Sequence, residues 1–174
     1  MIACRTKSAD DTRELAAAMA PLVTPGDVIL LAGDLGSGKT VFAQGLGRAL
    51  GVERPITSPT FTLIHEYDAP GMRIMHADLY RLDRLQEVID LGLGELVDDD
   101  AIALVEWGDL AEAAFVTNFL EVRFAYVDGE DDSRHLALRT VGQAWSARLA
   151  ALQRALDRWD AHGNGNGNGN GSAA

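Results

Sequence analysis

The chain has 174 residues, which is enough for one domain with a sizeable hydrophobic core and a short tail. Its formal net charge of -11 argues against DNA binding or broad nucleic-acid binding by this chain alone, and against an anionic membrane surface as its partner. The single cysteine, Cys4, excludes an internal disulfide and a cysteine-rich zinc site, so we expect a buried structural thiol.

The sequence also predicts the location of the protein in the cell and the extent of its folded domain. No run of 18 apolar residues is present, and the first twenty residues lack the order of a signal peptide, so we expect a cytoplasmic protein without a membrane anchor. Residues 161–174 are mostly Gly and Asn and have few apolar groups to bury. We therefore predict one domain over residues 1–160 and a disordered tail over 161–174.

The first third of the chain predicts a strand, a helix and a second strand. Residues 1–6 form a short apolar stretch, and residues 8–23 have a helical pattern that begins with Ser8 and, three residues later, Asp11, the spacing of a capping box. Residues 27–33, "DVILLAG", are a continuous apolar run that ends in glycine. Such a run is typical of a strand buried on both faces of a parallel sheet.

The middle of the chain predicts a helix followed by a hairpin. Residues 39–50 have near-helical apolar spacing, although two glycines lower the helix propensity. Residues 60–67 and 72–79 alternate well enough for two strands, and the "DAPG" between them is typical of a turn. Residues 81–91 are predicted to be helical.

The last part of the chain predicts three more strands and a closing helix. Residues 101–107 form a second buried-type strand, followed by a short helix over 108–115. Strands 118–127 and 135–141 are predicted to be joined by an acidic turn. The C-terminal helix has one apolar stripe, predicted to pack on the sheet: Trp145, Leu149, Leu152, Leu156 and Trp159.

The motif G-x-x-x-x-G-K-T is matched by Gly33, Gly38, Lys39 and Thr40, between a predicted buried strand and a predicted helix. Glycines let backbone amides wrap a phosphate, and the helix N-terminus adds partial positive charge. Lys39 would reach the outer phosphates, and the Thr40 hydroxyl would bind Mg2+. The predicted nucleotide-binding residues of this stretch are Asp34, Leu35, Gly36, Ser37, Gly38, Lys39, Thr40 and Val41.

A magnesium site beside this loop needs a carboxylate, and the chain offers two. Glu106 ends the predicted strand 101–107 and would emerge next to the loop if that strand were the parallel neighbour of strand 27–33. Asp78 in "HADLY" is the competing carboxylate. We interpret His65 and His76 as structural histidines, because magnesium prefers oxygen ligands.

Other nucleotide-binding classes fit less well. "DAPG" imitates the D-x-x-G of GTPases, but Lys7 and Lys39 are the only lysines and neither can supply the N-K-x-D motif that reads guanine. A small-molecule kinase would carry an arginine-rich lid, whereas only Arg81 and Arg84 cluster.

The motifs "GDLGSGKT", "SPTFTLIHEY", "HADLYRL" and "VEWGD", in this order, resemble the bacterial TsaE (YjeE) family, whose ATPases take part in threonylcarbamoyladenosine modification of tRNA. The resemblance covers about residues 10–140. It implies a P-loop NTPase fold with a mixed central sheet flanked by helices.

The resemblance also implies the site and the partners. Lys39 and Thr40 would hold ATP and Mg2+, "SPTF" around Thr57 to Thr60 would act like a switch loop, and the site would be completed by Asp78, Glu106 and Trp107. Lys39, Glu106 and Asp78 are thus the expected catalytic residues, Thr40, Glu106 and Asp78 the metal ligands, and Thr60 and Trp107 further nucleotide contacts. Two partner subunits, TsaB-like and TsaD-like, would carry the transfer chemistry, with tRNA contacted at most indirectly and hydrolysis slow in their absence.

Some alternatives stay open from the sequence. Thr60 also fits an ordinary strand residue, since threonine favours strands, and Trp107 fits either stacking on adenine or packing under the sheet. At the level of function, the alternatives to the ATPase are a small-molecule kinase and a scaffold subunit that keeps its nucleotide without hydrolysing it.

Overall fold

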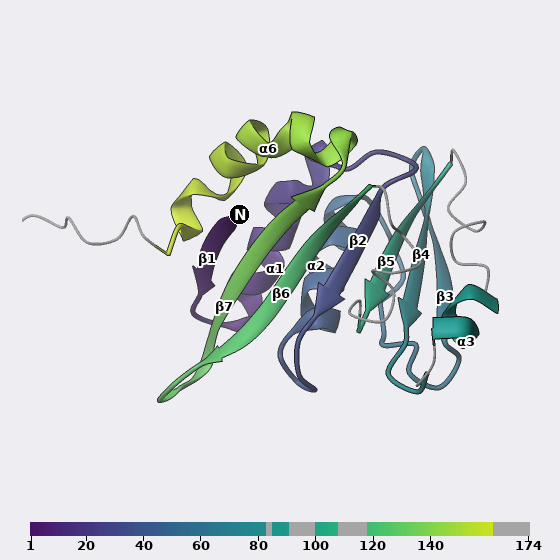
Figure 1. Cartoon of the computed structure of the whole chain (residues 1–174), viewed down its shortest axis with the longest axis horizontal. Coiled ribbons are helices and arrows are strands. Elements are labelled where there is room, and N and C mark those ends of the chain that lie inside the picture. Colours follow the sequence, from purple (N-terminus) through teal and green to yellow (C-terminus); the bar gives the residue numbers. More distant parts are fainter. Residues whose placement is uncertain (83–84, 91–99, 108–117, 162–174) are drawn as a thin grey trace, which may run out of the picture.

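The computed structural model describes residues 1–82, 85–90, 100–107 and 118–161, and within these it forms one seven-stranded sheet of order β1-β7-β6-β2-β5-β4-β3 (Figure 1). The strands are β1 (Ile2–Thr6), β2 (Val28–Ala32), β3 (Ile64–Ala69), β4 (Met72–Asp78), β5 (Ala101–Glu106), β6 (Phe119–Val127) and β7 (Glu130–Val141). The central pairs β6–β2, β2–β5 and β5–β4 are parallel, and the outer pairs are antiparallel. The predicted mixed sheet is confirmed.

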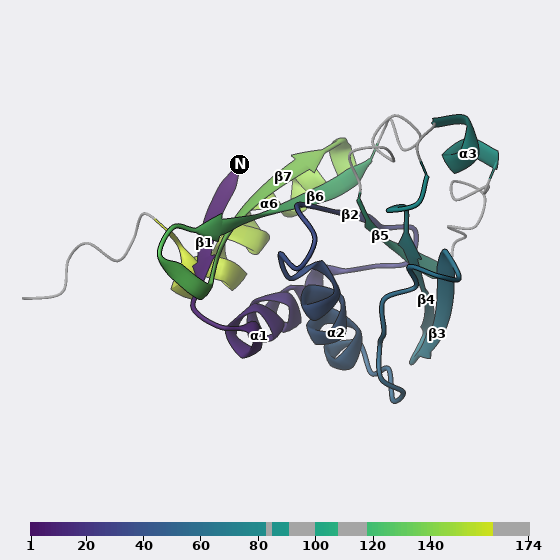
Figure 2. The same ribbon diagram turned by 90° about the horizontal axis from the view of Figure 1, so that it is seen from below.

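Three helices cover one face of this sheet: α1 (Ala9–Met19), α2 (Lys39–Ala49) and α6 (Gln143–Leu156), as Figure 2 shows. The short α3 (Leu85–Asp90) lies on the other side. Two 3-10 turns, Ala20–Leu22 and Asp157–Trp159, continue α1 and α6. No helix among the described residues is long and apolar enough to cross a membrane.

The two central strands, β2 and β5, are buried along their whole length, as their continuous apolar runs predicted. In β2, Ile29 and Leu31 belong to the larger core under the helices, whereas Val28 and Leu30 belong to a smaller core on the opposite face. Successive side chains of a strand point to opposite faces, so a strand covered on both sides must be apolar at every position. The carboxyl ends of these strands carry the candidate site.

Helix α1 begins as the sequence predicts. The Ser8 side chain accepts a hydrogen bond from the Asp11 amide at 3.1 Å, and the Asp11 carboxylate accepts one from the Lys7 amide at 2.8 Å. The first bond satisfies a backbone donor that the first turn of a helix leaves free, and the second ties the residue before the N-cap to that turn.

The glycines of α2 allow it to pack very close to α1. A Cβ atom added to Gly45 would lie 2.3 Å from the backbone oxygen of Arg13 in α1. Gln44 holds the same contact together, because its side chain accepts from the Arg13 guanidinium and donates to the backbone oxygen of Ile56 at 3.0 Å. The low helix propensity of glycine is thus offset by the close approach that it permits.

The C-terminal apolar stripe packs into the larger core against α1 and β7, as predicted. Trp145, Leu152 and Leu156 are fully buried, Leu149 is half-buried, and Trp159 is buried from the 3-10 turn. Cys4 is buried in the same core, which confirms the expected structural thiol, and burial raises its pKa to about 12 with a smaller contribution from the charge of Asp160.

The predicted hairpin over residues 60–79 is present, but its first strand is shorter than expected. β3 begins at Ile64 because the backbone oxygen of Pro59 accepts the amides of Thr62 and Leu63, which bends residues 59–63 into a turn. The interpretation of Thr60 as a strand residue is therefore wrong. Pro70 and Gly71, with a φ of 79° at the glycine, connect β3 to β4.

The connection between β6 and β7 is also shorter than the sequence suggested. The predicted acidic turn over 128–134 is wrong, since the turn contains only Asp128 and Gly129 and β7 begins at Glu130. Polar side chains are compatible with a strand here because this end of the hairpin is largely exposed to solvent.

Several predictions fall wholly or partly outside the described residues. They are the helix over 108–115, the end of the predicted helix 81–91, of which α3 forms Leu85–Asp90, and the tail beyond Ala161. Ala161 itself donates its amide to the backbone oxygen of Ala3. The assignment of one domain to residues 1–160 stays a prediction.

Candidate functional site

The loop between β2 and α2 has the local structure that its glycines predict. Gly33, Gly36 and Gly38 all have positive φ values, of 140°, 75° and 111°, which non-glycine residues rarely adopt. At Gly33 space is also limiting, since an added Cβ would lie 2.7 Å from the backbone oxygen of Phe124 in β6. We call residues 33–40 the P-loop.

Lys39 is held inside this loop. Its ammonium donates to the backbone oxygens of Gly33 at 2.8 Å and Asp34 at 2.9 Å, and it lies 4.1 Å from the centre of the Trp107 ring. Burial lowers the pKa of Lys39, and the negative charges of Glu106, Asp78 and Asp34 oppose that shift. Phosphate oxygens could replace the loop carbonyls as hydrogen-bond acceptors of the Lys39 ammonium. Their negative charge would complement its positive charge better than neutral carbonyls do.

Glu106 lies where the sequence predicted, because β2 and β5 are parallel neighbours and Leu31 is in register with Glu106. The Thr40 hydroxyl donates to Glu106 Oε1 at 2.8 Å. His76 Nε2 lies 2.9 Å from the same oxygen, with both side chains buried. A carboxylate can only accept, so His76 Nε2 carries the proton, and one Glu106 oxygen serves two donors.

Asp78 is the register partner of Glu106 in the neighbouring strand, so the structure brings together two carboxylates that the sequence analysis treated as competitors. Asp78 is 2% exposed and Glu106 3%. Asp78 accepts from the hydroxyls of Ser58 at 3.0 Å and Thr60 at 2.5 Å, and from the Tyr80 amide at 2.9 Å. The "SPTF" segment is thereby tied to the end of β4.

Trp107 follows β5 with a φ of 63°, an unusual value for a large residue. Its amide donates to the backbone oxygen of Leu31, and its ring lies 5.0 Å from the ring of Tyr80. The ring is half-buried, packs on the smaller core and faces the Lys39 ammonium. Trp107 is therefore placed beside the lysine, and stacking on adenine stays a prediction.

These groups line one cleft of about 260 Å³. Most of the predicted site residues border it: Leu35, Gly36, Gly38, Lys39, Thr40, Val41, Thr60, Asp78, Glu106 and Trp107. Asp34 and Ser37 do not, since Asp34 contributes its backbone oxygen to Lys39 and Ser37 is buried in the loop.

The oxygen groups of this cleft fit a magnesium ion. Within the described residues no cluster of three or more His, Cys, Asp or Glu side chains could hold a metal by itself. Mg2+ is usually held by one or two carboxylates together with phosphate oxygens, which matches Glu106, Asp78 and the Thr40 hydroxyl beside a phosphate-binding loop. The predicted roles of these residues in metal binding and catalysis stay predictions.

Two residues that line the cleft, Ser58 and Tyr80, received no role of their own in the sequence analysis. His76 was interpreted as structural, yet it bonds directly to Glu106, whereas His65 lies on the edge strand beside Tyr67. The alternation of β4 gave a usable signal, because residues two apart share one face and His76 must lie on the side of Asp78.

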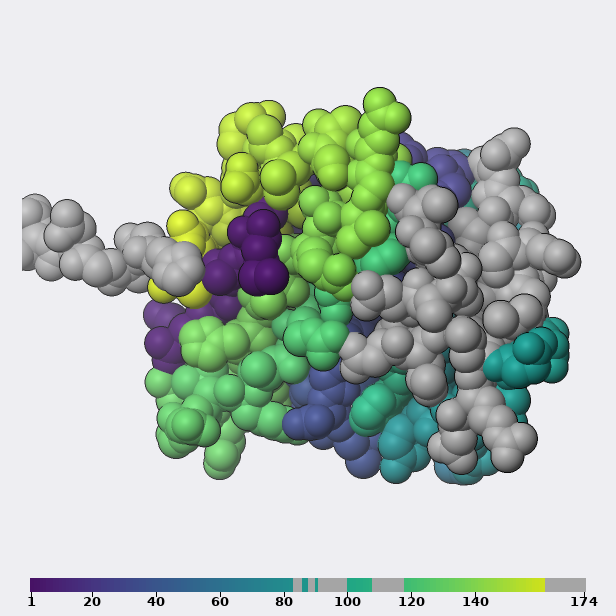
Figure 3. Space-filling model, in the orientation of Figure 1, coloured from purple at the N-terminus to yellow at the C-terminus, as the bar shows by residue number. Residues whose placement is uncertain are grey.

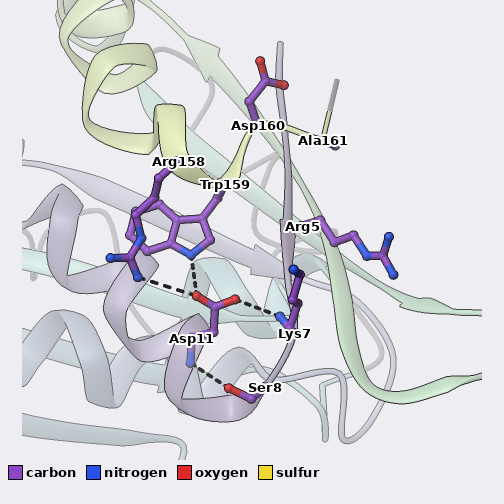
Figure 4. Close-up of a pocket in the computed structure, with 8 residues that line it drawn as sticks. All are labelled: Arg5, Lys7, Ser8, Asp11, Arg158, Trp159, Asp160 and Ala161. Carbon is purple, nitrogen blue, oxygen red and sulfur yellow. Dashed lines mark hydrogen bonds and ion pairs between the residues drawn. The ribbon is translucent and has the colours of Figure 1, made fainter. Parts of the chain in front are cut away.

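A second hollow, of about 550 Å³, lies at the start of α1 and does not include the P-loop (Figure 4). Two of its charged side chains, Asp11 and Arg158, pair with each other. Asp11 accepts from the Trp159 indole at 2.6 Å and pairs with Arg158, whereas Arg5 extends toward Glu130. The contacts of Asp11 join the start of α1 to the 3-10 turn that follows α6.

The comparisons with known proteins point to one family. A family model described as "Threonylcarbamoyl adenosine biosynthesis protein TsaE" matches residues 6–136. The tRNA threonylcarbamoyladenosine biosynthesis protein TsaE of Bacillus subtilis (strain 168) is 36% identical over 150 residues, 86% of this chain and 92% of that protein. The TsaE protein of Streptomyces coelicolor is 37% identical over 139 residues, 77% of this chain and 93% of that protein.

A solved structure is also similar. The crystal structure of YdiB from B. subtilis has a TM-score of 0.74 at 32% identity and covers 88% of this chain and 97% of that one. The sequence relatives and this structural neighbour match over most of their own length, and the family match spans the P-loop, β4 and β5. The resemblance carried by the four sequence motifs is confirmed, and the chain belongs to the TsaE family of P-loop NTPase-fold proteins.

Proposed function

We propose that this chain is a cytoplasmic ATPase subunit that binds and hydrolyses Mg-ATP, and that its nucleotide cycle drives assembly or turnover of the protein complex that makes the threonylcarbamoyladenosine modification of tRNA. The observation that carries the proposal is the convergence of Lys39, Thr40, Glu106 and Asp78 on one cleft beside the P-loop. The names of the relatives supply the pathway.

The loop amides and Lys39 would bind the β- and γ-phosphates of ATP. Lys39 would leave the carbonyls of Gly33 and Asp34 for phosphate oxygens, which replaces two neutral acceptors by charged ones. Fixed donors aimed at the transferred phosphoryl group stabilise charge in the transition state without reorganisation.

Magnesium, when bound, would offset the charge of the phosphates and link them to the carboxylates. Thr40 would offer its oxygen to the ion while its hydroxyl still donates a hydrogen bond to Glu106 Oε1. The second Glu106 oxygen and the Asp78 carboxylate would then hold the metal shell or orient the attacking water. Ser58 and Thr60 connect that chemistry to the "SPTF" segment, which a partner could order.

The partners are proposed to be two protein subunits, one TsaB-like and one TsaD-like, the latter carrying the transfer reaction. The net charge of -11 supports protein partners over direct contact with tRNA, because a strongly negative surface repels a phosphate backbone. Slow hydrolysis by the isolated chain is expected if the partners complete the site.

The test is release of phosphate from ATP, measured for the chain alone, with each partner, and with both partners plus tRNA. Lys39→Ala should abolish turnover, and Lys7→Ala is the matched control because Lys7 is the only other lysine and lies at the start of α1. Glu106→Gln should bind ATP but hydrolyse it at least about 100-fold more slowly. Wild-type turnover in Lys39→Ala would refute the proposal.

Two further assays, transfer of label from ATP and tRNA modification itself, separate the alternatives. A kinase would transfer the labelled γ-phosphate to a small molecule, and a scaffold would support repeated modification with Glu106→Gln as well as with the wild type.

A further inference from the structure

The β6–β7 hairpin lies beside the P-loop. β6 pairs with β2 as far as Ala32, where β2 ends, and then continues to Val127. The extended part of the hairpin therefore flanks residues 33–38 at the lower edge of the sheet in Figure 1, and Figure 3 shows the green hairpin against the blue residues around the loop. Two of its side chains contact the loop.

Both side chains contact backbone oxygens of the loop. The Tyr126 hydroxyl donates to the backbone oxygen of Leu35 at 2.8 Å. Arg134 Nε donates to the backbone oxygen of Ser37 at 3.0 Å, and Nη2 makes a longer bond to that of Gly36 at 3.4 Å.

The guanidinium of Arg134 is itself held in place. Nη1 donates to the backbone oxygens of Asp131 at 2.6 Å and Ser133 at 2.7 Å, and the group lies 4.4 Å from the centre of the Tyr126 ring. A planar guanidinium that is already held by these contacts loses little conformational freedom when it donates hydrogen bonds to the loop. The hairpin therefore presents a rigid set of donors.

These bonds determine where the loop amides point. No peptide bond in the described residues is cis, and in a trans peptide the C=O and the following N–H point in opposite directions. The carbonyls of Leu35 and Ser37 point to the hairpin, so the amides of Gly36 and Gly38 point away from it. Neither amide donates to an acceptor within the described residues, and both glycines line the cleft.

We propose that Tyr126 and Arg134 are positioning residues that hold the P-loop in its phosphate-binding form before the nucleotide arrives. The inference rests on the proposed nucleotide binding and deepens it. Three glycines with positive φ make the loop inherently adaptable, and a loop ordered only on binding loses affinity to that ordering. Neither side chain lines the cleft, so their effect acts through the backbone.

The experiment measures the dissociation constants of ADP and of inorganic tripolyphosphate by calorimetry, with Mg2+ and again in EDTA. Tyr126→Phe and Arg134→Gln should each weaken both ligands about 5- to 20-fold, since each removes a bond that fixes a peptide plane. Arg154→Gln on the exposed face of α6 is the charge-matched control and should change neither. Tripolyphosphate has no nucleoside, so an equal loss of affinity for tripolyphosphate and for ADP would place the effect at the phosphate-binding part of the site.

One further variant, Arg134→Lys, and one further measurement on Tyr126→Phe separate the proposed positioning role from its alternatives. Arg134→Lys keeps the positive charge but loses the planar guanidinium and its several donors, so it should bind both ligands as poorly as Arg134→Gln. Wild-type affinity in Arg134→Lys would mean that only the charge matters and would overturn the proposal. Tyr126→Phe removes one oxygen from a side chain that is 46% exposed, so its urea midpoint should stay at the wild-type value while affinity falls. Wild-type affinity in Tyr126→Phe and Arg134→Gln would also overturn it, whereas a wild-type chain that binds no nucleotide would instead refute the proposed function.

Discussion

Gly45→Ala tests whether the close approach of α1 and α2 is required by the packing. The new Cβ would lie 2.3 Å from the backbone oxygen of Arg13, about 1 Å short of an ordinary contact. A backbone atom cannot rotate away, so the two helices must separate and stretch the bonds between Arg13 and Gln44. Gly47→Ala is the matched control, because the one overlap of its Cβ would be with the terminal Cδ1 of Ile56, at 2.1 Å, which a rotamer change can remove.

Both substitutions gain about 1 kcal/mol of helix propensity. Overpacking against backbone costs about 3 kcal/mol, and a strained side-chain rotamer about 1 kcal/mol. Gly45→Ala should therefore lower the free energy of unfolding by about 2 kcal/mol, and Gly47→Ala should leave it near the wild-type value. Urea denaturation at fixed pH measures both, and the melting temperatures should differ by about 4–8 °C. Equal stabilities for the two variants would refute this packing argument.

Three further predictions concern single side chains. His76→Phe removes a donor from the buried Glu106 carboxylate and should lower the free energy of unfolding by about 1.5–3 kcal/mol, with partial recovery in His76→Gln; a wild-type urea midpoint in His76→Phe would contradict the bond. Burial raises the pKa of Cys4 from 9.0 to about 12, so the unfolded thiol ionises first and stability should fall as pH rises from 9 to 12, by about 1.4 kcal/mol at pH 10. Cys4→Ala should lack that part of the pH dependence. Trp107 faces the Lys39 ammonium at 4.1 Å, so a phosphate that draws the lysine away should change tryptophan fluorescence in the wild type but not in Trp107→Phe.

The P-loop could be predicted from sequence because its determinants are local. Phosphate binding needs glycines, a lysine and a helix start within eight residues, and the apolar run of β2 identifies the strand before them. The position of Glu106 followed from one assumption, that β2 and β5 are parallel neighbours, and the pairing of Leu31 with Glu106 confirms it. Apolar runs of this kind mark strands that are covered on both faces.

The contacts between distant segments could not be predicted in the same way. Arg134 was assigned to an acidic turn, because residues 130–134 extend the strand beyond the core and lack the apolar–polar alternation that identifies a strand in a sequence. Its contact with Ser37 joins residues that only the strand order β7-β6-β2 brings together. The contact between His76 and Glu106 could not be predicted for a related reason. Glu106 lies on the neighbouring strand, and no local sequence pattern identifies the pair.

The charges of the cleft predict that it is built for a magnesium-bound nucleotide. Lys39 contributes one positive charge, whereas Glu106 and Asp78 contribute two negative ones, all nearly buried. A bare triphosphate therefore meets a net negative site, and a unit charge about 8 Å away at an effective dielectric constant of about 20 opposes it by about 2 kcal/mol. Glu106→Gln removes one such charge and keeps an acceptor for His76.

We therefore expect Glu106→Gln to change ATP affinity in opposite senses with and without the metal. In EDTA it should bind ATP about 30-fold more tightly than the wild type, because a repulsive charge worth about 2 kcal/mol is gone. With Mg2+ the variant should bind ATP more weakly than the wild type, since only the wild type keeps the carboxylate that faces the ion. Calorimetric titration under both conditions measures the four constants, with Glu53→Gln, an exposed residue after α2, as the charge-matched control. Weaker ATP binding by Glu106→Gln in EDTA would mean that this carboxylate does not face the phosphates.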